Sequence, residues 1–245
     1  MNLVFACVIV GLMFVISSFV INVSAAEDAN PNIPTAKDII TRMADAYNAC
    51  KSYSDSGLVK IVFIRKDGTS VDERPFTTAF VRPDQFRFEY SSKFTGPGEK
   101  PLRHIVWAKG DDVRTWWDIQ PGNKKEVSLG MAVAGATGVS GGSAHMIPML
   151  LMPKEIEGWS ATDIREPNRI ADALLDNVDC YRIAGKYTDS DSESITLWIS
   201  KKTFLIHRID STSKFSDFRT ENTTTYKPVI DTEIDENQLA FNAPE

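Results

Sequence analysis

The segment Gly138-Val139-Ser140-Gly141-Gly142 matches the G-x-S-x-G motif of serine hydrolases. In that motif the serine follows a strand and precedes a helix, and this sharp turn lifts its hydroxyl above a parallel sheet. Here Ala- and Gly-rich residues precede Ser140, and no alternation of strands and helices surrounds it. A hydrolase is therefore the least favoured of three functions that we consider. A flexible hinge formed by Gly138, Gly141 and Gly142 is the favoured interpretation, because glycine tolerates backbone angles that other residues avoid.

Other reactive side chains are few and scattered. The histidines His104, His145 and His207 are not spaced as metal ligands usually are, so we expect neither a metal nor a cofactor. Cys50 and Cys180 are the two cysteines after the apolar N-terminal run, and no C-x-x-C motif occurs. Two alternatives stay open for them: one disulfide, or two buried thiols without a bond. The sequence thus favours a protein that is not an enzyme.

The overall charge excludes one large class of partner. The chain has a formal net charge of −6 and an isoelectric point near 5.2. It also lacks a long basic run that could neutralise a phosphate backbone. We therefore expect no nucleic-acid partner.

The N-terminus has the pattern of an export signal. An apolar run extends to Val23 and closes on the small residues Ser24-Ala25-Ala26. Cleavage after Ala25 or Ala26 would leave a mature chain that begins near Glu27. We expect residues 1–26 to be a signal peptide and the protein to be periplasmic. The alternative is a retained leader that anchors the protein to the membrane, since the run is long enough to span a bilayer.

After the leader, one amphipathic helix precedes a series of strands. Apolar residues recur at helical spacing over 36–50, with Thr35 as a plausible N-cap. The period then changes to two, with turn residues between short runs. The expected strands cover 56–65, 70–82, 86–91, 103–108, 113–119, 179–187, 194–200, 203–211 and 215–226. The segment 163–175 is expected to be irregular or briefly helical. Closely spaced strands without helical crossovers indicate an antiparallel sandwich or barrel.

The segment 128–153 differs from the strands on either side of it. It is the most apolar stretch after the leader, and we expect short helices separated by the glycine hinge. Such a segment can act as a movable lid, and flexible Met side chains adapt to ligands of different shape. Simple packing as core is the alternative. The side chains that we expect to line a ligand cavity or its lid are Trp107, Trp116, Met131, Val133, Met146, Met149, Leu150 and Leu151.

Several short motifs occur in an order that resembles a known family. They are Ile39 to Tyr47 leading into Cys50-Lys51-Ser52-Tyr53, then Phe80-Val81-Arg82-Pro83 with Phe86-Arg87-Phe88-Glu89-Tyr90, then Leu197-Trp198-Ile199-Ser200 before Leu205-Ile206-His207-Arg208, and finally Tyr226-Lys227-Pro228 and Phe241-Asn242-Ala243-Pro244. In this order they resemble the periplasmic outer-membrane lipoprotein carrier superfamily (LolA/LolB-like), in particular its uncharacterised carrier-like branch. Members have a half-open antiparallel β-barrel whose helices cover an apolar cavity for acyl chains. They also have an arginine that helps to hold the carrier closed; Arg42, on the expected helix, is not an evident match for it.

The residues and the resemblance lead to one set of expectations. We expect a mainly β fold over residues 27–245: a half-open antiparallel β-barrel, or strongly curved sheet, with a few helices over an apolar cavity. The expected function is non-catalytic binding or transport of a lipid, a lipoprotein acyl chain or another apolar ligand. The partner would then be a lipid or a lipidated protein. The alternative is an envelope sensor or interaction module whose concave sheet binds an envelope protein.

Overall fold

The computed structural model of the chain describes residues 33–92, 101–187 and 192–243. The expected leader, residues 1–26, lies outside this part. The elements below all belong to one unit, Pro34–Glu245. None of the helices in the described ranges has the length and apolarity needed to cross a bilayer.

The first element, helix α1 (Ala36–Ala49), begins where the sequence predicts it. The Thr35 hydroxyl accepts a hydrogen bond from the Asp38 amide at 3.2 Å, and the Asp38 carboxylate accepts one from the Thr35 amide at 3.0 Å. This reciprocal capping box satisfies amides that the helix itself leaves free. The apolar stripe of α1 includes Ile39, Met43 and Tyr47, and it is buried against the rest of the unit. The helical spacing of these apolar residues thus identified the buried face of α1 correctly.

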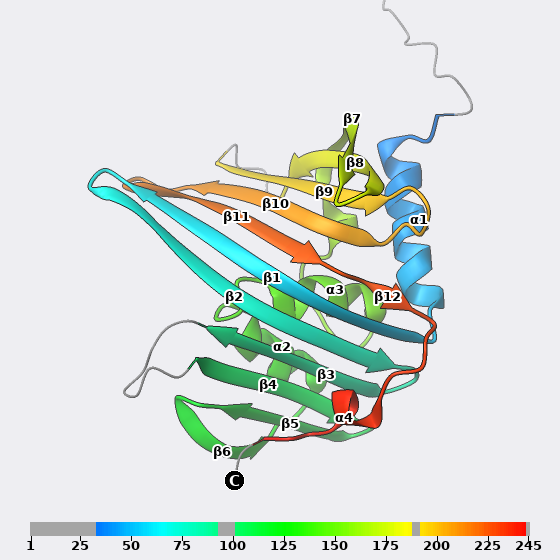
Figure 1. Ribbon diagram of the computed structural model, residues 1–245, viewed down its shortest axis with the longest axis vertical. Coiled ribbons are helices and arrows are strands. Elements are labelled where there is room, and N and C mark those ends of the chain that lie inside the picture. Colours follow the sequence, from blue (N-terminus) through cyan, green and yellow to red (C-terminus); the bar gives the residue numbers. More distant parts are fainter. Residues whose placement is uncertain (1–32, 93–100, 188–191, 244–245) are drawn as a thin grey trace, which may run out of the picture. The chain divides into compact units, whose positions relative to one another are not determined.

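Twelve strands form a single antiparallel sheet (Figure 1). They are β1 (Ser52–Arg65), β2 (Gly68–Val81), β3 (Gln85–Ser92), β4 (Leu102–Lys109), β5 (Asp112–Trp117), β6 (Gln120–Lys125), β7 (Arg165–Leu175), β8 (Val178–Lys186), β9 (Glu193–Ser200), β10 (Ile206–Lys214), β11 (Phe218–Tyr226) and β12 (Val229–Ile230). Most neighbours along the sheet are also neighbours in the chain. The exceptions are the pairings of β1 with β11 and with the short β12, which join the first half of the chain to the second.

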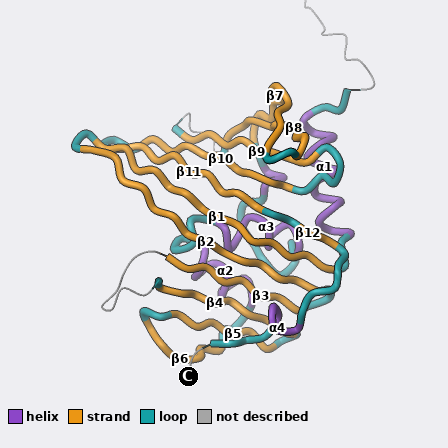
Figure 2. Tube along the Cα trace, viewed as in Figure 1, coloured by secondary structure: helices purple, strands orange, loops and turns teal. Residues whose placement is uncertain are grey.

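The sheet is curved and stays open (Figure 2). In the order of the described strands, β6 and β7 are the two ends. One face packs against α1, α2 (Leu129–Thr137) and α3 (Ser143–Leu151), and the core lies between them. Alternate residues of each strand point to this helix-bearing face, as an antiparallel sheet with two different faces requires. The expected fold, a half-open barrel with a few helices, is confirmed.

Strand β7 is the main departure from the sequence-based expectation. We expected residues 163–175 to be irregular or briefly helical, and this prediction was wrong. A short 3-10 turn, Ala161–Asp163, leads directly into β7. The pairing of β7 with β8 shifts register twice, between Arg165 and Asn168 and between Ile170 and Ala173. Such bulges interrupt the period-two alternation that would have identified a strand.

The C-terminal residues cover part of the other face of the sheet (Figure 1). Helix α4 (Glu236–Leu239) contacts β2 and β3. Beside it, the Trp107 indole donates a hydrogen bond to the Leu239 carbonyl at 2.6 Å. The Arg87 guanidinium donates to the Ala240 carbonyl at 3.0 Å. These contacts fix the end of the chain on the face opposite to α2 and α3.

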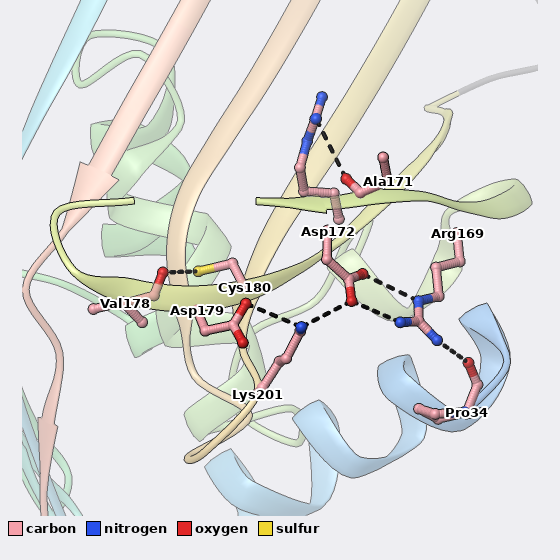
Figure 3. A network of polar contacts seen from close by, with 9 residues as sticks. Pro34, Arg169, Ala171, Asp172, Val178, Asp179, Cys180 and Lys201 are labelled. Carbon is pink, nitrogen blue, oxygen red and sulfur yellow. Dashed lines mark hydrogen bonds and ion pairs between the residues drawn. The ribbon is translucent and has the colours of Figure 1, made fainter. Parts of the chain in front are cut away.

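A polar network fixes the start of α1 to the edge of the sheet (Figure 3). Arg169 on β7 donates to the Pro34 carbonyl at 3.1 Å and forms an ion pair with Asp172 at 2.7 Å. Lys201, in the turn between β9 and β10, lies 2.9 Å from Asp172 and 3.0 Å from Asp179. The network therefore joins β7, β8 and the β9–β10 turn to Pro34, two residues before α1.

Candidate functional site

A pocket of about 240 Å³ lies beside the turn between α2 and α3. On one side it is bounded by the turn and the start of α3, and on the other by β10, β11 and the end of β8. Most of its surface is apolar. The lining residues are Thr137, Gly141, Gly142, His145, Met146, Trp159, Tyr187, Ile209, Ser211, Asn222 and Thr224.

Aromatic side chains form one wall of this pocket. The ring centroids of Trp159 and Tyr187 are 4.4 Å apart. The His145 Nε2 atom lies 2.8 Å from the Trp159 carbonyl oxygen; since a carbonyl only accepts, Nε2 is the donor. Burial raises the pKa of Tyr187 to about 12, so its phenol stays neutral. The Trp159 and Tyr187 rings are therefore uncharged, and the hydrogen bond from His145 attaches this wall to α3.

Two buried polar atoms of the lining have no hydrogen-bond partner among the residues that the structure describes. They are Nε1 of Trp159, which is a donor, and Oδ1 of Asn222, which is an acceptor. Buried polar atoms are usually paired, so two such atoms beside one pocket are consistent with a bound molecule or water. The pocket thus combines an apolar surface with two unused polar atoms.

The turn from α2 to α3 needs glycine at two positions. Gly141 and Gly142 have φ of +67° and +90°, in the left-handed region. A Cβ atom on Gly141 would lie 2.9 Å from Cγ1 of Val59 on β1, so the turn also packs closely on the sheet. Gly138 has a helical φ of −63°, and a Cβ there would meet nothing within 4 Å. Of the three expected hinge glycines, two have the backbone angles of a sharp turn and the third continues the helix.

This difference gives a matched pair of substitutions. Gly141→Ala is expected to lower the free energy of unfolding by about 2 kcal/mol, because it adds a left-handed alanine and a clash with β1. Gly138→Ala is expected to raise it by about 0.5 kcal/mol, because alanine is favoured in helical backbone. Chemical denaturation of both variants measures the two changes. Equal effects would show that the turn tolerates a side chain at position 141.

Ser140 has a structural role in this turn. It is fully buried and follows helix α2, so the strand that a nucleophile elbow requires is not in front of it. Its hydroxyl donates to the Thr137 carbonyl at 3.2 Å and accepts from the Ala144 amide at 3.1 Å. These bonds link the end of α2 to the start of α3.

The expected lid residues of segment 128–153 divide into three groups. Val133, Leu150 and Leu151 are buried in the core between the helices and the sheet. Met146 and Met149 are half-buried, and Met146 lines the pocket. Met131 is 64% exposed, on the side of α2 away from this pocket. Segment 128–153 is thus mostly core, with one of its methionines at the pocket wall.

Trp107 and Trp116 lie on the other face of the sheet. On β4, Val106 and Ala108 face the helices, so Trp107 between them points the opposite way, toward Phe241 at 5.8 Å between ring centroids. Trp116 is paired with Ile105 and shares that face. Neither tryptophan lines the pocket beside the α2–α3 turn, because the pleat of the strands turns both away from the helices.

Two arginines hold the helices, one in β2 and one directly after it, and the sequence patterns assigned neither a role. Arg82, the first residue after β2, donates through Nε to the Cys50 carbonyl at 2.7 Å, and through Nη2 to the carbonyls of Tyr47 at 2.9 Å and Leu151 at 3.1 Å. These carbonyls lie at the C-terminal ends of α1 and α3, neither of which has a basic residue in its last turn. A cation from the turn after β2 therefore compensates both helix dipoles.

The second arginine holds the turn. Nη1 of Arg74 donates to the Val139 carbonyl at 2.6 Å, and Asp72 orients the guanidinium through two further bonds. Asn222 donates to the Gly141 carbonyl at 3.3 Å. The turn and the end of α3 are thus attached to the sheet largely through backbone carbonyls, which are contacts that can break and form again.

Comparison with known proteins finds similar solved structures but no match to the sequence itself. No protein-family model and no curated protein matches the sequence. Solved structures do match. LprF from Mycobacterium bovis is 9% identical, with a TM-score of 0.49 over 85% of this chain and 97% of that one. A LolA superfamily protein from Nitrosomonas europaea is 10% identical, with a TM-score of 0.30 over 85% and 98%. Both likenesses are to the fold of these proteins.

A third similar structure is that of MucB in complex with MucA, from Pseudomonas aeruginosa. It is 11% identical, and the match covers 84% of this chain and 60% of that one, with a TM-score of 0.45. All three likenesses are to the fold alone.

The two cysteines among the described residues, Cys50 and Cys180, are free and buried. The Cys50 thiol, just after α1, donates to the Tyr47 carbonyl at 3.1 Å. The Cys180 thiol, on β8, points to the Val178 carbonyl at 3.5 Å. Burial raises the pKa of both thiols, that of Cys180 to about 11. Of the two alternatives left open by the sequence, the structure has the unbonded one, in which each thiol contacts a carbonyl of its own segment.

Proposed function

We propose that the protein binds an apolar or amphiphilic ligand, such as a lipid or a lipoprotein acyl chain, without a catalytic step. The pocket beside the α2–α3 turn carries this proposal. Its surface is mainly apolar, it lies between the helices and the sheet, and Met146 supplies an adaptable wall. Each methylene group buried there contributes about 0.8 kcal/mol to binding.

The size of the pocket implies that the helices move when a long chain binds. Its volume, about 240 Å³, is below the roughly 300–1,000 Å³ of sites for drug-sized ligands. We infer that α2 and α3 shift away from the sheet about the turn at Gly141 and Gly142. Arg74 and Arg82 would release their carbonyls in that step and bind them again when the ligand leaves.

A ligand with a polar group fits the pocket better than a pure hydrocarbon. The Trp159 indole can donate to a carbonyl or carboxylate oxygen, and the Asn222 side chain can accept from a hydroxyl. Lipids and acylated proteins both present a long apolar chain with such a group at one end. We further propose that residues 1–26 direct export and that binding takes place in the periplasm.

Blocking the pocket tests the proposal. Met146→Trp is expected to weaken binding of a fluorescent fatty acid at least tenfold, because the indole would occupy the space of the chain. Met131→Trp is the matched control, since Met131 is exposed outside this pocket. Fluorescence titration of both variants and the parent gives the dissociation constants. Unchanged binding in Met146→Trp, with the fold intact by circular dichroism, would exclude this pocket as the site.

A further inference from the structure

The tips of two neighbouring hairpins form a surface that the proposed pocket does not use. The β1–β2 and β10–β11 hairpins extend side by side beyond the helices (Figure 1). We call residues 63–68 and 214–219 together the hairpin-tip surface. We propose that this surface docks on a membrane that contains anionic phospholipids.

Aromatic rings form an apolar row on this surface. Phe215 is 54% exposed, and its ring is stacked on that of Phe218 with 4.5 Å between centroids. The Arg65 guanidinium lies 5.9 Å from the centroid of Phe218 and 5.1 Å from that of Phe63. Exposed rings at the end of a protruding element indicate an interaction site more than a packing role.

Cations surround these rings, although the chain as a whole is acidic. The surface carries four cations, Arg65, Lys66, Lys214 and Arg219, and two carboxylates, Asp67 and Asp217. Arg219 forms an ion pair with Glu221 at 2.9 Å. The net charge of the chain is −6, so the rest of the molecule is more negative still. An acidic protein would therefore be oriented with its tips toward an anionic surface.

Rings flanked by cations suit a bilayer interface better than they suit another protein. Aromatic side chains partition into the headgroup region, while Lys and Arg are attracted to anionic lipids. A stable protein interface uses roughly 20–30 residues on each side, far more than the tips offer. In a symmetric dimer through the tips, like charges would face one another.

The surface is continuous with the pocket along the strands. Phe63 and Arg65 are on the same face of β1 as Ile61, which is paired with the pocket residue Asn222. A docked tip would thus direct the pocket side of the sheet toward the bilayer. The orientation of the pocket toward the bilayer rests on the proposed function, whereas the docking of the tips on a membrane does not.

Vesicle binding tests the proposal, with the chain as it is recovered from the periplasm of expressing cells. We expect co-sedimentation with vesicles of phosphatidylglycerol and phosphatidylethanolamine, and much less with phosphatidylcholine alone. Lys66→Glu/Lys214→Glu is expected to weaken partitioning about 30-fold or more, and Phe215→Ser about tenfold. All three side chains are exposed, so neither variant should alter the fold.

Matched controls have the same chemistry elsewhere on the unit. Lys109→Glu/Lys202→Glu reverses two exposed lysines away from the tips, and Leu174→Ser removes a side chain that is 67% exposed at the edge strand β7. Both controls should bind vesicles as the parent does.

Equal binding by tip and control variants, or equal binding to neutral and anionic vesicles, would overturn the proposal. So would a tip-dependent dimer in sedimentation velocity without vesicle binding. The tip variants should bind fatty acid with the same dissociation constant as the parent. A loss of fatty-acid binding would therefore count against the proposed pocket and not against membrane docking.

Discussion

Replacement of Arg82 by alanine is expected to lower the free energy of unfolding by about 3 kcal/mol. The change removes three hydrogen bonds from a charged donor, each of which contributes on the order of 1 kcal/mol or more. It also leaves carbonyls at the ends of α1 and α3 without their shared partner. Urea denaturation followed by circular dichroism measures the loss, and hydrogen exchange should become faster in α3.

Two further arginine variants serve as controls for the Arg82→Ala prediction. Arg82→Lys keeps a cation near both helix ends but not the planar fork, so about half of the loss is expected. Arg42→Ala removes an exposed arginine of α1 whose contact is a cation–π interaction with Phe204 at 5.5 Å, and a loss below about 1 kcal/mol is expected. If Arg42→Ala and Arg82→Ala were equally destabilising, the role of Arg82 at both helix ends would be refuted.

The second large effect concerns Asp55, a carboxyl group in the core. Its Oδ2 atom accepts a hydrogen bond from the Tyr53 hydroxyl at 2.7 Å, and its Oδ1 atom is buried without a bond to any described residue. The buried phenols of Tyr47 and Tyr226 lie in the same cluster. Burial raises the pKa of Asp55 to about 6, from about 3.8, because the ionised form is poorly solvated there.

The direction of the pH effect follows from this raised pKa. The folded protein holds the Asp55 proton more tightly than the unfolded chain does, so this stabilisation is complete below pH 3.8 and is lost as the pH rises through 6. The whole effect is about 3 kcal/mol. Asp55→Asn keeps a neutral acceptor for Tyr53 at every pH. We therefore expect the variant to match the parent near pH 4 and to be more stable by up to about 3 kcal/mol at pH 7.5.

The free energy of unfolding must be compared between the variant and the parent at each pH, because another buried group changes stability with pH in the opposite direction. Burial lowers the pKa of His104 to about 4, so the contribution of His104 to stability is lost as the pH falls below 6.5. The difference between parent and Asp55→Asn, measured by denaturation at each pH, removes this contribution. A difference that does not change between pH 4 and pH 7.5 would contradict the assignment to Asp55.

The sequence predicted much of the fold because its local patterns are regular. Helical spacing and the Thr35 cap placed α1, and alternation placed most strands to within a few residues. The two lid helices followed from the apolar segment with glycines in the middle. Strand β7 was missed, since its bulges disturb the alternation, and the two-residue β12 and the short helix α4 were not predicted either.

The pocket could be predicted only in part. Met146 and the glycines lie in one distinctive segment. Trp159 comes from the loop between α3 and β7 and Tyr187 from the residue after β8, whereas Asn222 reaches the pocket through the pairing of β1 with β11. That pairing joins distant parts of the chain and leaves no local signal. The tryptophans show the same limit: Trp116 and Trp117 are adjacent, so one must face the helices, and only the strand register decides which.

The role of Arg82 was also out of reach, although one signal was present. Helices α1 and α3 both end without a basic residue, and Arg82 lies in the turn directly after β2. Helix ends of this kind require a cation or another donor from elsewhere. Which of the arginines supplies it depends on the position of α3, which is fixed by tertiary packing.

Native mass spectrometry of protein recovered from the periplasm tests the central claim most directly. If the protein binds a lipid or acyl chain beside the α2–α3 turn, the spectrum should contain a species heavier than the chain by the mass of a lipid. That species should be lost in Met146→Trp and kept in Met131→Trp. A spectrum with the bare chain alone, together with no binding of a fluorescent fatty acid, would contradict the account.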